Sequence, residues 1–218
     1  MNVFVLTSGR SGSLTFAEAC RHITNYSTGH ETRVGLIGEA RLDYPERHIE
    51  VDNRLAWFLG RLQAGYGDDA FYVHLRRDPE ATAASHVKRW NKPAMRSFRQ
   101  GILWDVDPKA DRMAIARDLV HTMDSNIELY LRDKTRTMRI DIASAASSFP
   151  ELWERIGAEG DLGAALQELS VRHHQGKSRR LHPRVDGAEA FESDGTPRSS
   201  SRGNGGRSVR LVRLLRRA

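Results

Sequence analysis

A short apolar run leads into a glycine-rich loop at the start of the chain, and an amphipathic stretch follows at once. The segment reads NVFVLTSGRSGSLT at positions 2–15. Its apolar part, Val3 to Leu6, is typical of a buried strand in a parallel sheet. Gly9 and Gly12 allow the backbone to turn sharply and to approach a ligand closely. Apolar positions at helical spacing follow Gly12, so the free N–H groups of the first helical turn would point back at the loop and favour an anion.

The loop lacks the residues that hold Mg·ATP in nucleoside triphosphatases. Those proteins need four residues between two glycines, then Lys and a Ser or Thr that binds magnesium. Here Arg10 and Ser11 alone separate the glycines, and Ser13 and Leu14 stand in place of the Lys–Ser pair. The sequence therefore predicts a phosphate site in which Arg10 and hydroxyl groups meet the charge without a metal. An ordinary tight turn between strand and helix is the structural alternative.

A second strand, turn and helix are predicted at residues 71–90, which read FYVHLRRDPEATAASHVKRW. The first five residues have the composition of a strand, and Glu80 to Trp90 that of a helix. Asp78 is suited to cap this helix, and the proline after it fits the first helical turn. Arg77, at the strand end, and Ser85, on the helix, could then hold one further phosphate from the side.

Together, the two segments resemble the sulfotransferases that use 3′-phosphoadenosine 5′-phosphosulfate (PAPS). The resemblance implies a P-loop-like fold that uses no metal, in which the first loop binds the 5′-phosphosulfate. It also implies that Arg77 and Ser85, eight residues apart, bind the 3′-phosphate. Many cytosolic members have Lys at the position of Arg10. Several bacterial and carbohydrate-sulfating members have Arg there, and this chain resembles them in that respect. The residues that the resemblance places at the 5′-phosphosulfate are Arg10, Ser11, Gly12, Ser13, Leu14 and Thr15.

Sulfuryl transfer to an alcohol needs in-line attack, stabilisation of developing charge and usually a base for the acceptor's proton. Arg10 would face the developing charge. Glu31 is our first candidate for the base and His30 the second, since both follow the first helix, where the next strand would end beside the loop. Asp52 is a further candidate, because it would end a strand near the same edge, although capping of a helix at Arg54 to Leu62 also explains it.

The acceptor is predicted only as a hydroxyl or amine of a sugar or small metabolite. Variable loops, here Leu42 to His48 and Asn91 to Asp107, are expected to form its pocket. Trp90 and Trp104 could line that groove, stack on adenine, or pack in the core.

Strand and helix patterns alternate along the remaining chain. Asp111 to Arg132 has the apolar period of a long helix, Thr137 to Ala143 alternates as a strand does, and Pro150 to Ile156 reads as a short helix. Alternation of this kind requires crossover connections. The sequence therefore predicts a three-layer α/β sandwich around a mainly parallel sheet, with Val3 to Leu6 as a central strand.

The net charge of +6 is concentrated near the end of the 218-residue chain. Residues 177–218 contain eleven Lys and Arg against four Asp and Glu, and they are rich in Gly and Ser. We therefore predict an α/β domain at 1–176 and a basic, disordered tail at 177–218. The tail could contact nucleic acid or anionic lipid, or be dispensable.

Composition narrows the function classes further. A single cysteine, Cys20, excludes an internal disulfide framework and a zinc set, and we expect it to be a small buried apolar residue. The sequence contains no apolar run of bilayer length and no signal-peptide pattern, so we expect a cytoplasmic protein. A phosphotransferase is disfavoured by the missing Lys after Gly12. A non-catalytic protein that binds nucleotide or nucleic acid remains an alternative to the sulfotransferase.

Overall fold

The computed structural model describes residues 1–170 of the chain. The predicted boundary at 176 and the tail at 177–218, with its expected contacts to lipid or nucleic acid, lie outside the described residues. Within residues 1–170 one sheet is present, and every pair of neighbouring strands in it is parallel. Its strands are β1 (Val3–Leu6), β2 (Ser27–His30), β3 (His48–Val51), β4 (Phe71–Arg76) and β5 (Thr137–Asp141).

The strand β1 lies in the centre of the sheet, whose order is β2-β3-β1-β4-β5. It pairs with β3 on one side and β4 on the other, so that Val5 stands between Val51 and Val73. All four residues of β1 are fully buried, which explains why this strand is a continuous apolar run. The structure confirms the predicted α/β fold with β1 as a central strand.

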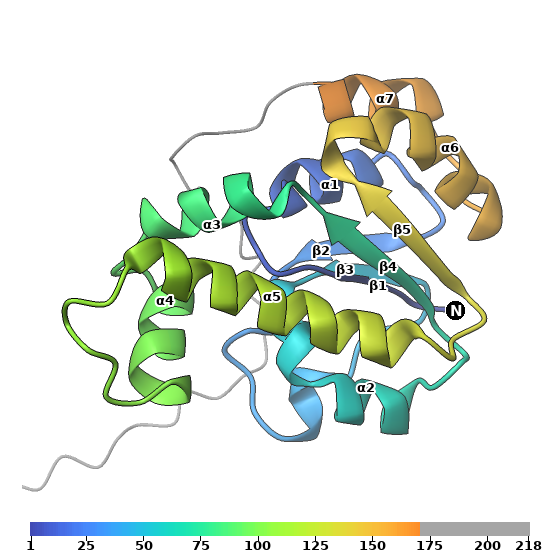
Figure 1. Ribbon diagram of the computed structural model, residues 1–218. Coiled ribbons are helices and arrows are strands. Elements are labelled where there is room, and N and C mark those ends of the chain that lie inside the picture. The colour runs from blue at the N-terminus through green and yellow to red at the C-terminus, as the bar shows by residue number, and fades with distance from the viewer. Residues whose placement is uncertain (171–218) are drawn as a thin grey trace, which may run out of the picture. The chain divides into compact units, whose positions relative to one another are not determined.

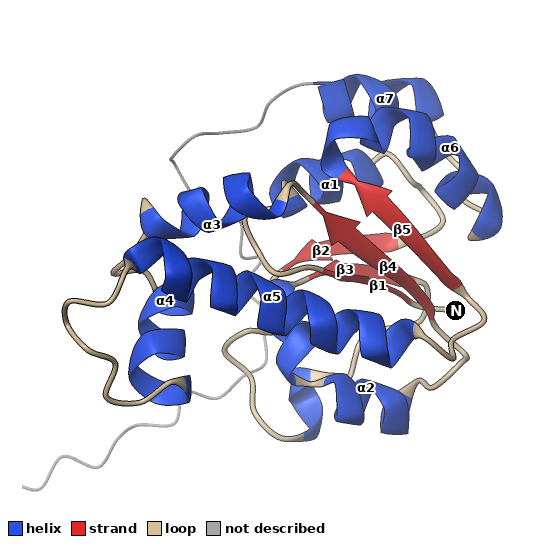
Figure 2. Ribbon diagram, viewed as in Figure 1, coloured by secondary structure: helices blue, strands red, loops and turns tan. Residues whose placement is uncertain are grey.

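Helices cover both faces of the sheet and make three layers (Figure 1, Figure 2). One face carries α1 (Ser13–Cys20), α6 (Ala145–Arg155) and α7 (Leu162–Ser170). The other face carries α2 (Leu59–Gly65), α3 (Pro79–Val87), α4 (Pro93–Ser97) and α5 (Arg112–Leu131). Val3 and Val5 pack with the first set of helices, and Phe4 and Leu6 with the second. The strand therefore serves two separate cores, because successive side chains of a strand point to opposite faces.

The connections that leave β1 and β4 run to opposite faces of the sheet. The helix α1 follows β1 on one face, whereas α3 follows β4 on the other. The two strands are neighbours, so their carboxyl ends flank the point at which the winding of the fold reverses. Ligands of open parallel sheets bind in the crevice at such a point.

The structure corrects the predicted helix at Arg54 to Leu62. A 3₁₀ helix spans Asn53–Trp57, and α2 begins only at Leu59. Phe58, between the two, has a non-helical φ of −120°. Leu55 and Leu62 are both buried, so the apolar spacing was right although the backbone between them is broken.

The short helix predicted at Pro150 begins five residues earlier, at Ala145. Pro150 lies inside α6 although it cannot donate a backbone hydrogen bond there. Ala145, Phe149 and Leu152 are buried along one face of the helix, and this packing outweighs the missing donor. The predicted stop is confirmed, since Gly157 follows the helix with a φ of 62°.

Other predicted elements change at their ends. The strand predicted to Ala143 ends at Asp141, because the Asp141 carboxylate accepts the Ala143 N–H (2.8 Å) and starts a 3₁₀ helix. The helix predicted at Glu80 to Trp90 begins at Pro79 and ends at Val87, with Asp78 as its cap as expected. The buried state predicted for the Cys20 side chain is confirmed, and burial raises the pKa of its thiol.

Candidate active site

The loop between β1 and α1 has a backbone that only certain residues tolerate. Gly9, Arg10 and Gly12 have φ angles of 81°, 61° and 79°, in the left-handed region. A Cβ atom at Gly12 would lie 2.5 Å from Ile142 Cγ1, and one at Gly9 would lie 2.7 Å from Asn53 Nδ2. The glycines are therefore required both for the turn and for the close approach of these neighbours.

Hydroxyl groups inside the loop hold it in shape. The Ser11 and Thr7 hydroxyl oxygens are 2.6 Å apart, Ser11 Oγ donates to the Gly9 carbonyl, and Gly9 N–H donates to Thr7 Oγ1. Ser11 is fully buried. Loop hydroxyls were expected to meet the phosphate charge, but the Ser11 hydroxyl already forms hydrogen bonds within the loop. Its backbone N–H is the group suited to an anion.

The first turn of α1 adds free backbone N–H groups to those of the loop. Gly12 is the residue before the helix, so the N–H groups of Ser13, Leu14 and Thr15 lie in its first turn, where no intrahelical acceptor exists. The Ser13 hydroxyl lies 3.0 Å from Nε2 of His30 at the end of β2. The helix dipole adds partial positive charge at this place.

Three residues predicted at the phosphates come together from three segments of the chain. Arg10 Nε donates to Ser85 Oγ (3.2 Å), and Arg77 Nη1 donates to the Arg10 backbone carbonyl (3.2 Å). Burial first, and then the charges of Arg89 and Arg77, lower the pKa of Arg10 from its ordinary 12.5. A guanidinium keeps its proton at neutral pH all the same. The cluster is thus a set of crowded positive charges that an anion would stabilise.

Two residues of this cluster were missed by the sequence analysis. His86 Nε2 donates to the Ser8 carbonyl (3.2 Å), and burial lowers its pKa to about 4, so the ring is neutral at pH 7. Arg89 lies near enough to Arg10 to affect its pKa. Both lie close after Ser85 in the chain. The sequence predicted a helix to Trp90, in which Arg89 would share the face of Ser85, although α3 ends at Val87. That spacing could have pointed to Arg89.

The two candidate bases lie at the carboxyl end of β2, as predicted. His30 is the last residue of the strand, and Glu31 follows with a φ of 55°. Glu31 Oε2 pairs with Arg54 Nη1 at 2.8 Å. The Glu31 charge also acts on Arg10, where it opposes the lowering of the pKa by burial and by the neighbouring arginines. Thr32 fixes the segment, because its N–H and hydroxyl both donate to the buried Glu50 carboxylate (2.7 and 2.6 Å). Glu31 therefore stands on a fixed backbone facing the Arg10 side of the loop.

Asp52 has a structural environment. It is fully buried, its Oδ2 accepts from Arg41 Nη2 (2.6 Å), and its Oδ1 accepts the Arg54 N–H (2.8 Å). Burial raises the pKa of Asp52, while the Arg54 N–H and the Arg41 charge oppose that rise. Capping and an ion pair occupy both oxygens, so Asp52 is not placed to take a proton from a substrate.

Comparison with solved structures identifies the fold. A sulfotransferase domain from the curacin biosynthetic pathway matches with a TM-score of 0.58 and 15% sequence identity, over 80% of this chain and 78% of that chain. The fold is sulfotransferase-like. No family model matches the sequence, and no curated protein matches it.

The two tryptophans whose roles the sequence left open line the same cavity of this sulfotransferase-like fold. Trp90 and Trp104 line one cavity of about 520 Å³ beside the amino end of α5. The guanidiniums of Arg99 and Arg112 lie over the Trp90 ring, 5.0 and 5.2 Å from its centroid. Trp90 is therefore not free to stack on adenine, and Trp104, 77% exposed, is not a core residue.

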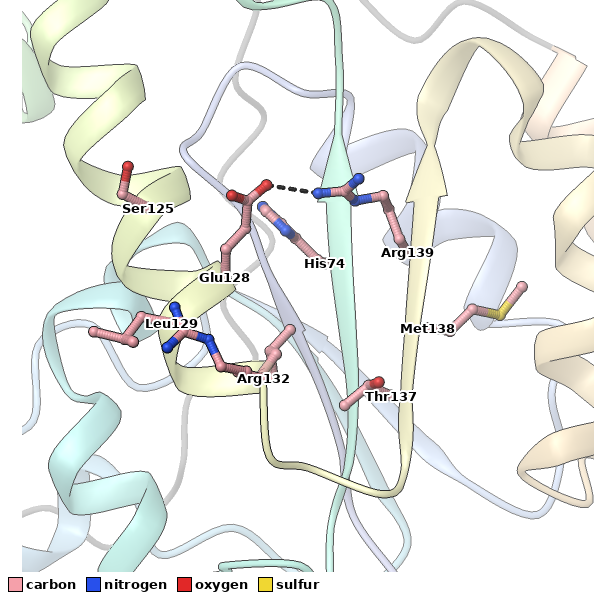
Figure 3. Close-up of a pocket in the computed structure, with 9 residues that line it drawn as sticks. His74, Ser125, Glu128, Leu129, Arg132, Thr137, Met138 and Arg139 are labelled. Atoms are coloured by element: carbon pink, nitrogen blue, oxygen red, sulfur yellow. Dashed lines mark hydrogen bonds and ion pairs between the residues drawn. The ribbon is translucent and has the colours of Figure 1, made fainter.

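A second cavity, of about 580 Å³, lies between α5 and β5 (Figure 3). Its Glu128 carboxylate faces Arg139 and is already paired with Arg139 Nη2 (2.6 Å) and Arg76 Nη1 (3.3 Å). His74, also in its wall, has Asp124 as a partner (3.3 Å). None of the residues predicted at the phosphates or as a base lines it. Glu128, Arg139 and His74 thus already have partners within the protein, and the loop after β1 remains the candidate site.

Residues 1–170 contain neither a membrane-spanning helix nor a cluster of metal-binding side chains. No helix in this part of the chain is both long and apolar enough to cross a bilayer. No group of three His, Cys, Asp or Glu side chains here lies close enough together to share a metal ion.

Proposed function

We propose that this protein is a sulfotransferase that moves a sulfuryl group from PAPS to a hydroxyl or amine of a sugar or small metabolite. The observation that carries the proposal is the meeting of Arg10, Arg77 and Ser85 at the carboxyl ends of β1 and β4. These residues come from the two segments that resemble the phosphate motifs of the family. Arg10 is 67 positions from Arg77 and 75 positions from Ser85 in the sequence. The sulfotransferase-like fold supports the same reading.

Each part of the cluster has a role in this proposal. The N–H groups of the loop and of the first turn of α1 bind the 5′-phosphosulfate, and Arg77 and Ser85 bind the 3′-phosphate. PAPS supplies the sulfuryl group. Glu31 takes the proton of the acceptor as the new bond to sulfur forms, and Arg10 stabilises the negative charge left on the phosphate when its bond to sulfur breaks.

A comparison of ligands in thermal unfolding tests the proposal. A ligand that binds only the folded protein raises the melting temperature. We expect a rise with 3′-phosphoadenosine 5′-phosphate, and none of similar size with Mg·ATP or an oligonucleotide. A rise with Mg·ATP alone would favour a phosphotransferase, and a rise with the oligonucleotide alone would favour a nucleic-acid-binding protein. Formation of a sulfated product from PAPS, followed by mass spectrometry, then tests the reaction itself.

We predict that Arg77→Ala weakens binding of 3′-phosphoadenosine 5′-phosphate about 10- to 100-fold. A charge-assisted hydrogen bond contributes roughly 1.5–3 kcal/mol. Only a ligand that carries the 3′-phosphate forms this bond, so only such a ligand loses affinity in the variant. Adenosine 5′-phosphate, which lacks that group, should therefore bind both proteins alike in calorimetric titration. Arg76→Ala is the matched control, because Arg76 pairs with Glu128 on the α5 side. An equal loss for both nucleotides would remove Arg77 from this role.

A further inference from the structure

The cavity beside the amino end of α5 contains an unusual set of charged side chains. It is lined by residues that follow α3 and by the first residues of α5, among them Trp90, Arg99, Trp104 and Arg112. Arg99 and Arg112 both hold their guanidiniums over the Trp90 ring. Two cations are therefore gathered on one wall of a space of about 520 Å³.

The Arg99 side chain has a donor that nothing in the described chain satisfies. Its Nη2 donates to Asn91 Oδ1 (3.1 Å), but its Nε is buried and has no hydrogen-bond partner. Within residues 1–170, neither Arg99 nor Arg112 forms an ion pair with a carboxylate. A buried donor without a partner destabilises the folded protein, and a charged donor does so more strongly. An anionic oxygen in the cavity would balance the charges of the two arginines that line it.

The rest of the wall favours an organic ligand that also carries hydroxyl groups. Trp104 offers a large apolar surface, since it is 77% exposed and lines the same cavity. Asp105 and Asp107 add carboxylates that can accept hydrogen bonds from hydroxyls, and one Asp107 oxygen already accepts the Lys109 N–H (2.7 Å). The cavity thus has a cationic wall, an aromatic surface and acceptor groups. A bare inorganic anion would use only the first of these.

The wall of the cavity is connected in sequence with the residues around Arg10. Trp90 directly follows Arg89, whose charge acts on Arg10 of the phosphate loop. It also lies three residues beyond the end of α3, the helix that carries Ser85, the partner of Arg10. The chain thus leads from the proposed phosphate site directly into the wall of the cavity.

We propose that this cavity binds the acceptor of the sulfuryl group, and that the acceptor is a hydroxylated organic carboxylate whose carboxylate is bound by Arg99 and Arg112. The role of the ligand as acceptor rests on the proposed function, whereas the binding of its carboxylate does not. Sugar acids and hydroxylated aryl acids share this chemistry.

Calorimetric titration of the full chain without nucleotide tests the site directly. The probes are 4-hydroxyphenylacetate and D-glucuronate, each compared with a neutral counterpart, 4-hydroxyphenylacetamide and D-glucose. We expect at least one acid to bind 10-fold or more tightly than its counterpart, and the pair that shows this distinguishes an aryl acid from a sugar acid. Equal binding of acid and neutral compound in both pairs, or no binding of either acid, would overturn the proposal.

Variants then assign the effect to the cavity. Arg99→Met keeps most of the side-chain length without the charge, and it should abolish the preference for the acid. Arg112→Gln is a second variant that should reduce it, in case the first does not fold. Arg96→Met is the matched control, because Arg96 is an exposed arginine of α4 that does not line the cavity. If Arg96→Met and Arg99→Met behave alike, the preference does not arise here and the proposal is wrong.

The two proposals can fail separately. Binding of an acid that depends on Arg99, without any sulfuryl transfer from PAPS, would leave the site standing and remove the sulfotransferase function. Transfer to the acids at the same rate in Arg99→Met as in the unchanged protein would do the reverse.

Discussion

We expect Glu31→Gln to lower turnover about 100-fold or more while the affinity for 3′-phosphoadenosine 5′-phosphate stays nearly constant. Gln keeps the shape of Glu and can still accept a hydrogen bond from Arg54, but it cannot take a proton from the acceptor. Thr32 and its two hydrogen bonds to Glu50 are unchanged by the substitution, so the backbone at position 31 should be retained. Steady-state rates of product formation, with nucleotide binding by calorimetry, measure both quantities.

Two controls separate Glu31 from the neighbouring candidates. His30→Ala removes the ring that contacts Ser13, and Asp52→Asn removes the charge of the buried pair with Arg41. We expect the folded fraction of each control to retain most of its turnover. If Glu31→Gln is nearly as active as the unchanged protein and His30→Ala is inactive, His30 is the base. If all three variants are active, no side chain of these segments acts as the base.

Arg41→Met should destabilise the folded protein by about 3–5 kcal/mol at neutral pH, because it leaves a buried carboxylate without its cation. Arg41 is 3% exposed and donates both to Asp52 (2.6 Å) and to the Tyr44 hydroxyl (3.2 Å). Urea unfolding measured by circular dichroism gives the free energy of unfolding. Arg61→Met is the control, since the Arg61 guanidinium is exposed and makes one backbone hydrogen bond, and its loss should cost about 1 kcal/mol or less.

The loss in Arg41→Met should shrink as the pH falls. The pKa of Asp52 is already raised by burial above its ordinary 3.8, and without Arg41 it rises further, because the opposing charge has gone. A carboxyl whose pKa is higher in the folded state stabilises the fold while it is protonated, and this contribution disappears as the pH rises through the folded pKa. The difference in stability between the two proteins should therefore be larger at pH 7 than near pH 4. A difference that does not change with pH would show that Asp52 is not the group left uncompensated.

Local patterns were sufficient for the elements that build the site. The apolar run at Val3 to Leu6 and the glycines after it predicted β1, its loop and α1 correctly, because strand, turn and helix preferences act over a few residues. The convergence of Arg10, Arg77 and Ser85 also followed from the sequence, since the carboxyl ends of parallel strands meet at one edge of a sheet.

Tertiary contacts decided what those residues are free to do. Spacing along the chain was sufficient for the succession of strands and helices in the sulfotransferase-like fold, because strand and helix patterns are local. Only the structure showed that the Ser11 hydroxyl is hydrogen-bonded to Thr7 and that the buried Asp52 forms an ion pair with Arg41. It also showed that α6 continues through Pro150. Burial and charge pairing depend on which side chains of other segments are near, and local spacing does not encode that. For the same physical reason, the unpaired Arg99 donor beside Trp104 became apparent only in the folded chain.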